Sequence, residues 1–155
     1  MFSKVKLLVM DFDGVMTNNK VIVDENGKES VTCNRSDGMG IEMLLEKCIG
    51  AIVISKETNK VVKARCKKLS IPCVNGIDDK ITILKKELKS RGLKPENVCY
   101  MGNDVNDIEC MEYVGVAVAV NDAYPEVKKF AQYVTNKNGG EGAVREVIDN
   151  IIKFY

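Results

Sequence analysis

Short apolar runs alternate along the chain with longer stretches in which apolar residues recur every three or four positions. The short runs are too brief for buried helices, and they predict strands. They lie at residues 5–10, 51–54, 71–74, 96–101, 114–120 and 133–135. Strands that alternate with helices in this way connect through right-handed crossovers. We therefore predict a parallel sheet in a Rossmann-like, three-layer α/β/α sandwich.

The stretches between the strands predict the helices that cover this sheet. The first helix is expected to begin at a capping Asp37 and to end at Gly50. Its buried stripe is expected to run from Ile41 to Cys48, at helical spacing. Further helices are expected over residues 62–69, 81–92 and 125–131, after residue 107, and from residue 141 onward.

A β-hairpin is predicted between the first strand and the first helix. Two β-branched runs within residues 20–33 flank Asn26 and Gly27, a pair that favours the tight turn of a hairpin. No repeat, low-complexity tract or linker interrupts the chain. Residues 1–155 are therefore expected to form a single domain.

Composition and charge exclude several classes of function. The chain has 155 residues, of which 45% are hydrophobic and 29% charged, as in a soluble globular protein. Its net charge of +1 provides no basic excess for binding a nucleic-acid backbone. No apolar stretch reaches the ~20 residues that a membrane span needs. The first strand also begins too early in the sequence for a secretory signal peptide.

The cysteine and histidine content indicates the cellular compartment and limits the side chains that are available for acid–base catalysis. The 6 cysteines lie far apart without a Cys-x-x-Cys pair, and there is no histidine to complete a zinc site. We therefore expect reduced thiols in the core of a cytoplasmic protein. Without histidine, acid–base chemistry near neutral pH must use a carboxylate, lysine, tyrosine or cysteine.

Polar residues with catalytic potential are concentrated where the apolar runs stop. These residues are Asp11, Asp13, Ser55, Lys80, Asn103, Asp104 and Asp107. The carboxyl ends of parallel strands lie along one edge of a sheet, which is where ligands bind in open α/β folds. Carboxylates that converge there repel one another unless a cation lies among them, and an all-oxygen site suits Mg²⁺. Because Mg²⁺ in turn binds phosphate, this edge is expected to carry out phosphoryl transfer.

Four of these residues fit separate roles in that reaction. Asp11, held at the end of its strand, fits a nucleophile that forms an aspartyl-phosphate. Asp13, two residues further on, points to the same side and fits the acid that protonates the leaving oxygen. Ser55 is expected to donate a hydrogen bond to a phosphoryl oxygen. Lys80 is expected to neutralise charge on the nucleophile and on the transferred group.

In order and spacing, residues 11–17, Ser55, Lys80 and 102–107 resemble the four motifs of the haloacid dehalogenase superfamily of phosphatases. Residues 35–40 and 139–146, together with the hairpin, are similar to the small branch without a separate cap domain, which acts on sugar-acid phosphates.

The resemblance implies several properties of the protein. One is Mg²⁺-dependent hydrolysis of a phosphorylated sugar acid, with metal held by the Asp11 carboxylate, the Asp13 carbonyl and the fourth motif. Another is a homotetramer in which the hairpin mediates assembly and a neighbouring subunit helps to close each active site. Residues 139–142 are then a lid.

The chain departs from the family pattern at two places. One concerns the metal ligands, and the other concerns the choice of substrate. Family members usually carry aspartate at the position of Asn103, which leaves open whether Asn103 or Asp104 is the direct metal ligand. Octulosonate 8-phosphate phosphatases typically show Thr-Gly-Arg where this chain has residues 55–57. A glutamate at Glu57, with Arg65 and Lys68 on the following helix, resembles the nine-carbon branch.

This pattern favours N-acylneuraminate 9-phosphate or a deaminated relative as the substrate. The eight-carbon 3-deoxy-octulosonate 8-phosphate is the alternative. Glu57, Arg65 and Lys68 are candidate substrate contacts, although a charged helix face is often only a solvated one. Thr17 is a candidate phosphate contact or helix cap.

Two other classes of protein are compatible with parts of this pattern. Some related cap-less domains are attached to sugar-nucleotide synthetases and look like non-catalytic assembly modules, but this chain retains both Asp11 and Asp13. A receiver-type signalling domain also combines a parallel sheet, an acceptor aspartate, Mg²⁺ and a lysine. Its acceptor normally follows the third strand, whereas the aspartate pair here follows the first. Both features favour the enzyme.

Overall fold

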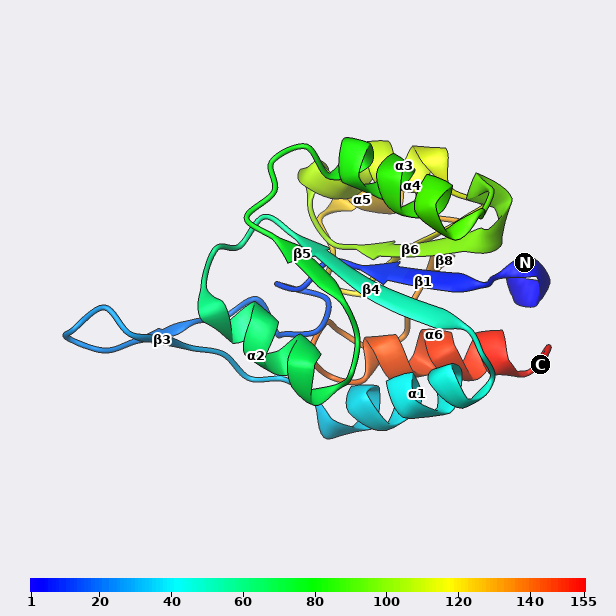
Figure 1. Ribbon diagram of the computed structural model, residues 1–155. Coiled ribbons are helices and arrows are strands. Elements are labelled where there is room, and N and C mark those ends of the chain that lie inside the picture. The colour runs from blue at the N-terminus through cyan, green and yellow to red at the C-terminus, as the bar shows by residue number, and fades with distance from the viewer.

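A parallel sheet of 6 strands lies at the centre of the protein in the computed structural model, which describes residues 1–155 (Figure 1). The strand order is β5-β4-β1-β6-β7-β8, and every neighbouring pair is parallel. The bounds are β1 (Leu7–Met10), β4 (Gly50–Ser55), β5 (Cys73–Asn75), β6 (Val98–Gly102), β7 (Val116–Ala119) and β8 (Tyr133–Val134). The predicted Rossmann-like sheet is confirmed.

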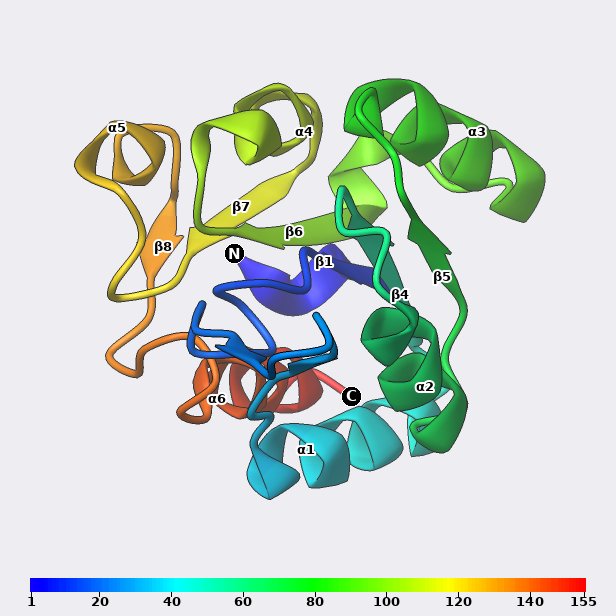
Figure 2. The same cartoon turned by 90° about the vertical axis from the view of Figure 1, so that its left-hand side faces the viewer.

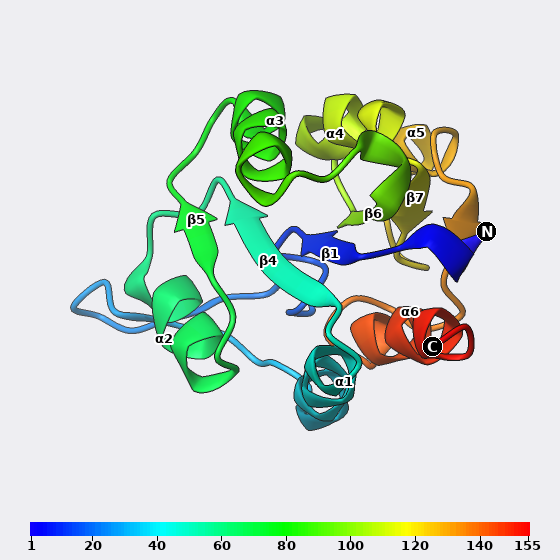
Figure 3. The same cartoon turned by 45° about the vertical axis from the view of Figure 1, so that its right-hand side comes forward.

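Helices cover both faces of the sheet, as Figures 2 and 3 show. One layer consists of α1 (Arg35–Glu46), α2 (Lys60–Lys68) and α6 (Ala143–Ile152). The other consists of α3 (Lys80–Arg91), α4 (Ile108–Tyr113) and α5 (Pro125–Lys128). Short 3₁₀ turns occupy η1 (Phe2–Lys4), η2 (Pro95–Asn97) and η3 (Val105–Asp107). None of the helices has the length and apolar character needed to cross a bilayer.

The central strand β1 explains why the strand sequences are continuously apolar. All its residues are buried, and it pairs in register with β4 on one side and β6 on the other. Because both faces of the sheet are covered, no position on β1 faces water. Each large apolar side chain that is removed from water contributes about 1.5–3 kcal/mol to stability. The site at the end of β1 therefore follows a fully buried strand in the middle of the sheet.

The predicted hairpin is present as β2 (Ile22–Val23) and β3 (Glu29–Ser30), which pair antiparallel. Its turn uses Gly27 at a φ of 77°, and the Asp24 carboxylate accepts hydrogen bonds from two main-chain amides of the turn. In Figure 1 the hairpin projects well beyond the sheet on the side where β1 ends. Its apolar residues at positions 21–23 are exposed to solvent, and Ile22 has a relative exposure of 68%.

The boundaries of the first helix differ from the prediction. Asn34, not Asp37, caps α1, because its side chain accepts the hydrogen bond of a main-chain amide in the first turn. The helix stops at Glu46, and Cys48 adopts a left-handed φ of 58°. Cys48 therefore leaves the helical stripe and is exposed, unlike the buried thiol that was expected. Gly50 does not end the helix but begins β4.

Other elements are shorter than their patterns predict. Strand β1 excludes Val5, which follows the η1 turn, and β6 starts only at Val98, after the η2 turn. The helix that was expected over residues 125–131 ends at Lys128. Val5 is nevertheless fully buried, and Phe130 and Ala131, beyond the end of α5, are partly buried and pack against the core.

Asp37 connects α1 to the start of α6. Its side chain is buried, and one carboxylate oxygen accepts the main-chain N–H of Arg145 at 2.9 Å. The other oxygen is buried without a hydrogen-bond partner. Burial raises the pKa of Asp37 to about 6, against the opposing effect of that amide and of two nearby arginines.

This raised pKa makes stability depend on pH. The folded protein binds the Asp37 proton more tightly than the unfolded chain does, so the unfolding free energy falls as pH rises from about 4 to about 6. We expect wild type to lose about 2–3 kcal/mol relative to Asp37→Asn between pH 4 and pH 7. Urea unfolding of both proteins at the two pH values measures this difference. A pH-independent difference between the two proteins would contradict it.

Candidate active site

A polar cleft of about 380 Å³ opens at the carboxyl edge of the sheet, beyond β1, β4 and β6. No hydrophobic residue lines it. Its lining consists of Asp11, Asp13, Asn19, Ser55, Lys56, Glu57, Thr58, Asn103, Asp104 and Asn106. The structure thus brings together the residues that follow three separate strands. A cleft of this composition suits a small, highly charged ligand.

Asp11 is held in one orientation immediately after β1. Its main-chain amide donates to the Met101 carbonyl, and one carboxylate oxygen accepts the Phe12 amide at 2.7 Å. The other oxygen lies 3.0 Å from the Lys80 ammonium. Burial and the nearby Asp107 carboxylate raise the pKa of Asp11 to about 7, while Lys80 opposes the rise. The carboxylate is therefore fixed at the cleft with a cation beside it.

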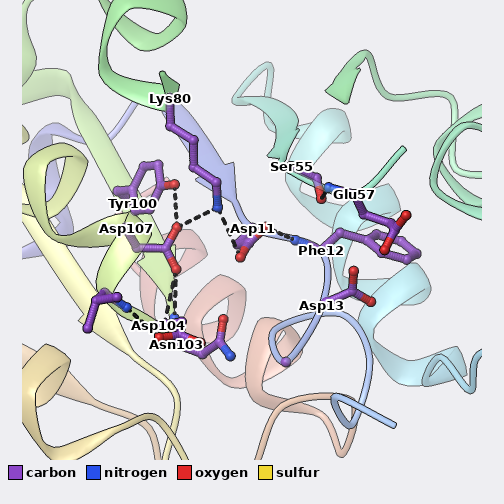
Figure 4. Close-up of polar contacts among 12 residues, drawn as sticks. Asp11, Phe12, Asp13, Ser55, Glu57, Lys80, Tyr100, Asn103, Asp104 and Asp107 are labelled. Carbon is purple, nitrogen blue, oxygen red and sulfur yellow. Dashed lines mark hydrogen bonds and ion pairs between the residues drawn. The ribbon is translucent and has the colours of Figure 1, made fainter. Parts of the chain in front are cut away.

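Lys80, the first residue of α3, reaches the site from the helix layer above the sheet (Figure 4). Its ammonium is buried between two carboxylates, 3.0 Å from Asp11 and 2.8 Å from Asp107. Burial alone would lower the pKa of Lys80, but the two carboxylates outweigh burial and raise it. Lys80 is consequently a permanent cation next to Asp11, as its predicted role requires.

Asp107 organises the side of the site formed by β6. It is fully buried and accepts the Lys80 ammonium and the Tyr100 hydroxyl, both at 2.8 Å. Its second oxygen accepts the main-chain amides of Asn103 at 3.0 Å and Asp104 at 3.3 Å. The sequence indicated Asp107 only as part of an acidic cluster. The capping-box spacing from Asp104 to Asp107 was a usable signal for its local role, whereas nothing marked Tyr100.

Asp13 lies on the opposite side of the site from Lys80, near Glu57 (Figure 4). Burial raises the pKa of Asp13, and the charge of Glu57 raises it further. A carboxyl group with a raised pKa is better able to donate a proton near neutral pH. Both Asp13 and Glu57 line the cleft, as predicted.

Thr17 lies behind the cleft and not in its lining. Its fully buried hydroxyl accepts the amides of Gly14 at 3.1 Å and Asn19 at 3.2 Å, and it donates to Asp13 at 3.5 Å. Thr17 therefore closes the turn that carries Asp13. The sequence suggested a phosphate contact or a helix cap for Thr17, but no helix begins directly after it, and its hydroxyl is engaged within the turn.

Ser55 ends β4 and faces the cleft. Its hydroxyl oxygen accepts the Glu57 amide at 3.1 Å, which leaves the hydroxyl proton free to point at a ligand. The turn after β4 thus fixes Ser55 and Glu57 together.

Asn103 and Asp104 differ in how their side chains are used. Asn103 is buried, and its side-chain oxygen has no hydrogen-bond partner. One Asp104 oxygen is already engaged in capping η3, where it accepts the Val105 amide at 2.7 Å. An unpartnered buried oxygen normally indicates an absent ligand or water.

The oxygen donors of the cleft fit Mg²⁺. No group of three or more acidic, histidine or cysteine side chains is gathered closely enough to hold a metal on its own. Magnesium, however, binds proteins through only one or two carboxylates and fills its other positions with neutral oxygens, waters and phosphate. Asp11, the Asp13 carbonyl and the unpartnered Asn103 oxygen are donors of this kind.

Arg65 and Lys68 do not line this cleft. They lie on α2 and line a different hollow, together with Cys33, Met39 and Glu42. Arg65 donates to the Asn34 carbonyl at 3.0 Å, toward the start of α1. Within one chain, therefore, the structure brings Glu57 to the site but leaves the two basic residues apart from it.

The chain is similar in sequence to a known hydrolase family and to a phosphatase within it. The model of the haloacid dehalogenase-like hydrolase family matches residues 55–148. The 3-deoxy-D-manno-octulosonate 8-phosphate phosphatase of Escherichia coli K12 is 38% identical, over 96% of this chain and 79% of that protein.

Solved structures of octulosonate 8-phosphate phosphatases have folds that closely match this one. The octulosonate 8-phosphate phosphatase of Yersinia pestis is 36% identical with a TM-score of 0.96, and the match covers 98% of this chain and 83% of that one. The Moraxella catarrhalis enzyme, whose crystal structure contains magnesium, phosphate and the sugar acid, is 31% identical with a TM-score of 0.94. That match covers 98% of this chain and 88% of the other.

Proposed function

The chain belongs to the haloacid dehalogenase-like hydrolases, and from this premise we propose that it is a Mg²⁺-dependent 3-deoxy-octulosonate 8-phosphate phosphatase. Its family and its phosphatase relatives together indicate a phosphoric monoester hydrolase, and those relatives are named as phosphatases of a sugar-acid phosphate. The observation that carries the proposal is that Asp11, which lines an entirely polar cleft, is paired with a buried Lys80. This arrangement supports a catalytic role over that of an assembly module.

In the first step, Asp11 attacks the phosphorus atom and forms an aspartyl-phosphate while the bond to the sugar oxygen breaks. The Phe12 amide and Lys80 hold the two oxygens of the Asp11 carboxylate, so little motion is needed to reach the attacking geometry. Asp13 donates its proton to the departing sugar oxygen. The raised pKa of Asp13 supports this role.

In the second step, Asp13, now ionised, takes a proton from water, and the resulting hydroxide attacks the phosphorus of the aspartyl-phosphate. This attack releases inorganic phosphate and regenerates Asp11 as a carboxylate. Ser55 donates a hydrogen bond to a phosphoryl oxygen, and Lys80 balances the developing negative charge. Asp11, the Asp13 carbonyl and Asn103 would hold Mg²⁺, which when bound adds further charge neutralisation at the phosphoryl group.

Assembly of several copies is part of the proposal. The hairpin projects from the protein with apolar residues 21–23 exposed, which favours a contact between subunits. We propose a homotetramer in which a neighbouring subunit completes each cleft. In such an assembly Arg65 and Lys68 would act as substrate contacts only by reaching the cleft of another copy.

A nine-carbon sugar acid is the second candidate substrate. The sequence pattern favoured it, whereas the relatives named above favour the eight-carbon compound. The observation that keeps it as a candidate is the position of Glu57, which lines the cleft beside Asp13. An acidic residue there suits a hydroxyl-rich or amide-bearing part of the substrate.

A steady-state comparison of the two phosphate esters tests the proposal. We expect kcat/KM for 3-deoxy-octulosonate 8-phosphate to exceed that for N-acylneuraminate 9-phosphate by about tenfold or more. Glu57→Gln should alter this ratio more than Lys56→Gln, a change of charge in the same cleft wall. A preference for the nine-carbon ester would restore the alternative substrate, and no turnover of either ester would refute the sugar-acid assignment.

A further inference from the structure

We propose that Gly139, Gly140 and Asp122 form a clamp that positions the turn at residues 13–17 for catalysis. None of the three residues lines the cleft, so each acts as a positioning residue through Asp13 and Asn103. The inference deepens the proposed phosphatase function and rests on it. The resemblance implied that residues 139–142 are a lid, whereas Gly139 and Gly140 here pack against the chain's own catalytic turn.

The clamp is built on main-chain contacts. The Gly140 amide donates to the Val15 carbonyl at 3.0 Å. A β-carbon on Gly139 would overlap the carbonyl oxygen of Gly14, and one on Gly140 would overlap the Asn18 amide nitrogen. The two segments therefore cross at a distance that only glycine permits. At Gly139 the constraint is purely steric, because its backbone is not in the left-handed region.

Asp122 holds this crossing in place from the loop after β7. Its carboxylate accepts the Gly139 amide at 2.8 Å. Two residues later in the same loop, the Tyr124 amide donates to the main-chain carbonyl of Asn103 at 3.0 Å. A single loop therefore fixes both the crossing and the residue proposed to bind the metal.

The turn at residues 13–17 also packs closely against the Asn103 side chain. Gly14 adopts a φ of 79°, and a β-carbon there would overlap the side-chain amide of Asn103. The Gly14 peptide is thus in close contact with both the Asn103 side chain and Gly139. A displacement of Gly139 toward the turn would press on the Gly14 carbonyl and displace Gly14. Asp13, which precedes Gly14, would move with it.

Two disruptive variants and one conservative variant test the clamp. Gly139→Ala inserts a methyl group against the Gly14 carbonyl, and Asp122→Ala removes the acceptor without adding bulk. Asp122→Asn keeps an acceptor oxygen and should restore function. Gly92→Ala is the matched glycine control, since Gly92 ends α3 with a left-handed φ and has open space around it. Asn97→Ala removes a comparable loop acceptor before β6.

The variants are compared by kcat, KM, Mg²⁺ affinity from titration calorimetry, and hydrogen exchange of residues 13–18. We expect Gly139→Ala to lower kcat about 100-fold, because displacement of a reacting group by about 1 Å has an effect of that size. Asp122→Ala should lower kcat or Mg²⁺ affinity about tenfold, as for other residues that support metal ligands. Both should accelerate exchange in residues 13–18 with little change in KM.

Several outcomes separate the clamp from a merely structural role. If the glycine and asparagine controls lose as much kcat as the clamp variants at equal loss of stability, the clamp is refuted. Unchanged exchange and Mg²⁺ affinity in folded Asp122→Ala would also refute it, even if Gly139→Ala failed to fold. If wild type hydrolyses neither sugar-acid phosphate but the clamp variants still weaken Mg²⁺ binding and loosen residues 13–18, the proposed function fails and the clamp stands.

Discussion

Asp11→Asn is expected to lower phosphatase turnover by about 10⁴-fold or more while the protein remains folded. Asparagine has nearly the shape of aspartate but cannot act as a nucleophile toward phosphorus. The fold should persist because Lys80 keeps its contact with Asp107 at 2.8 Å, so its charge is not left alone in the core. Measurements of kcat, thermal unfolding and acid-trapped phosphoenzyme check the three parts of this prediction.

The matched control is Asp24→Asn, the same chemical change in the hairpin turn. Its side-chain oxygen can still accept the amides of the turn, so kcat should stay near that of wild type. Phosphoenzyme trapped from wild type but not from Asp11→Asn would support covalent catalysis. An Asp11→Asn protein with activity close to wild type would exclude Asp11 as the nucleophile.

Asp107→Ala should cause the largest loss of stability, about 3–5 kcal/mol of unfolding free energy. The carboxylate accepts four hydrogen bonds in the buried site, including one from the Lys80 ammonium. Its removal leaves these donors without their acceptor and Lys80 with only Asp11 as a partner. Turnover should fall as well, since the orientation of Lys80 and of the Asn103 backbone depends on Asp107.

Urea unfolding of a short variant series measures this effect. Tyr100→Phe removes one of the four donors and should cost about 1 kcal/mol. Asp107→Asn keeps an acceptor oxygen but loses the charge, so its unfolding free energy should lie between those of Tyr100→Phe and Asp107→Ala. Equal stability losses for Tyr100→Phe and Asp107→Ala would show that the carboxylate does not stabilise the buried cation.

The fold and the centre of the site were predictable because they follow from simple regularities. The length and spacing of the apolar runs predicted the strands of the sheet. In a parallel sheet, the carboxyl ends of the strands lie along one edge. This rule alone was enough to bring Asp11, Ser55 and Asn103 together. The cap of α1 was assigned wrongly to Asp37 because Asn34 and Asp37 are both good capping residues, and only tertiary packing draws Asp37 toward α6.

The roles of other residues depend on directions that a sequence does not specify. Thr17 was recognised as part of a motif, but its burial depends on how the turn folds back over β1. Arg65 and Lys68 lie on the helix that follows the cleft residue Glu57, yet the packing of α2 turns them toward another hollow. Gly139 was expected only as part of a lid over residues 139–142. Its close contact with Gly14 depends on a segment that is distant in sequence, so no local pattern marks it.

Removing the Lys80 charge from water costs free energy, and the burial of Lys80 places this cost in the folding of the protein. In an exposed site, a lysine must shed its hydration shell each time a substrate arrives. Here Lys80 is already enclosed between Asp11 and Asp107 in the folded protein. Its dehydration belongs to the free energy of folding, and the reorganisation energy of each catalytic cycle is correspondingly smaller. The packing that keeps Lys80 buried therefore contributes to the reaction rate as well as to the fold.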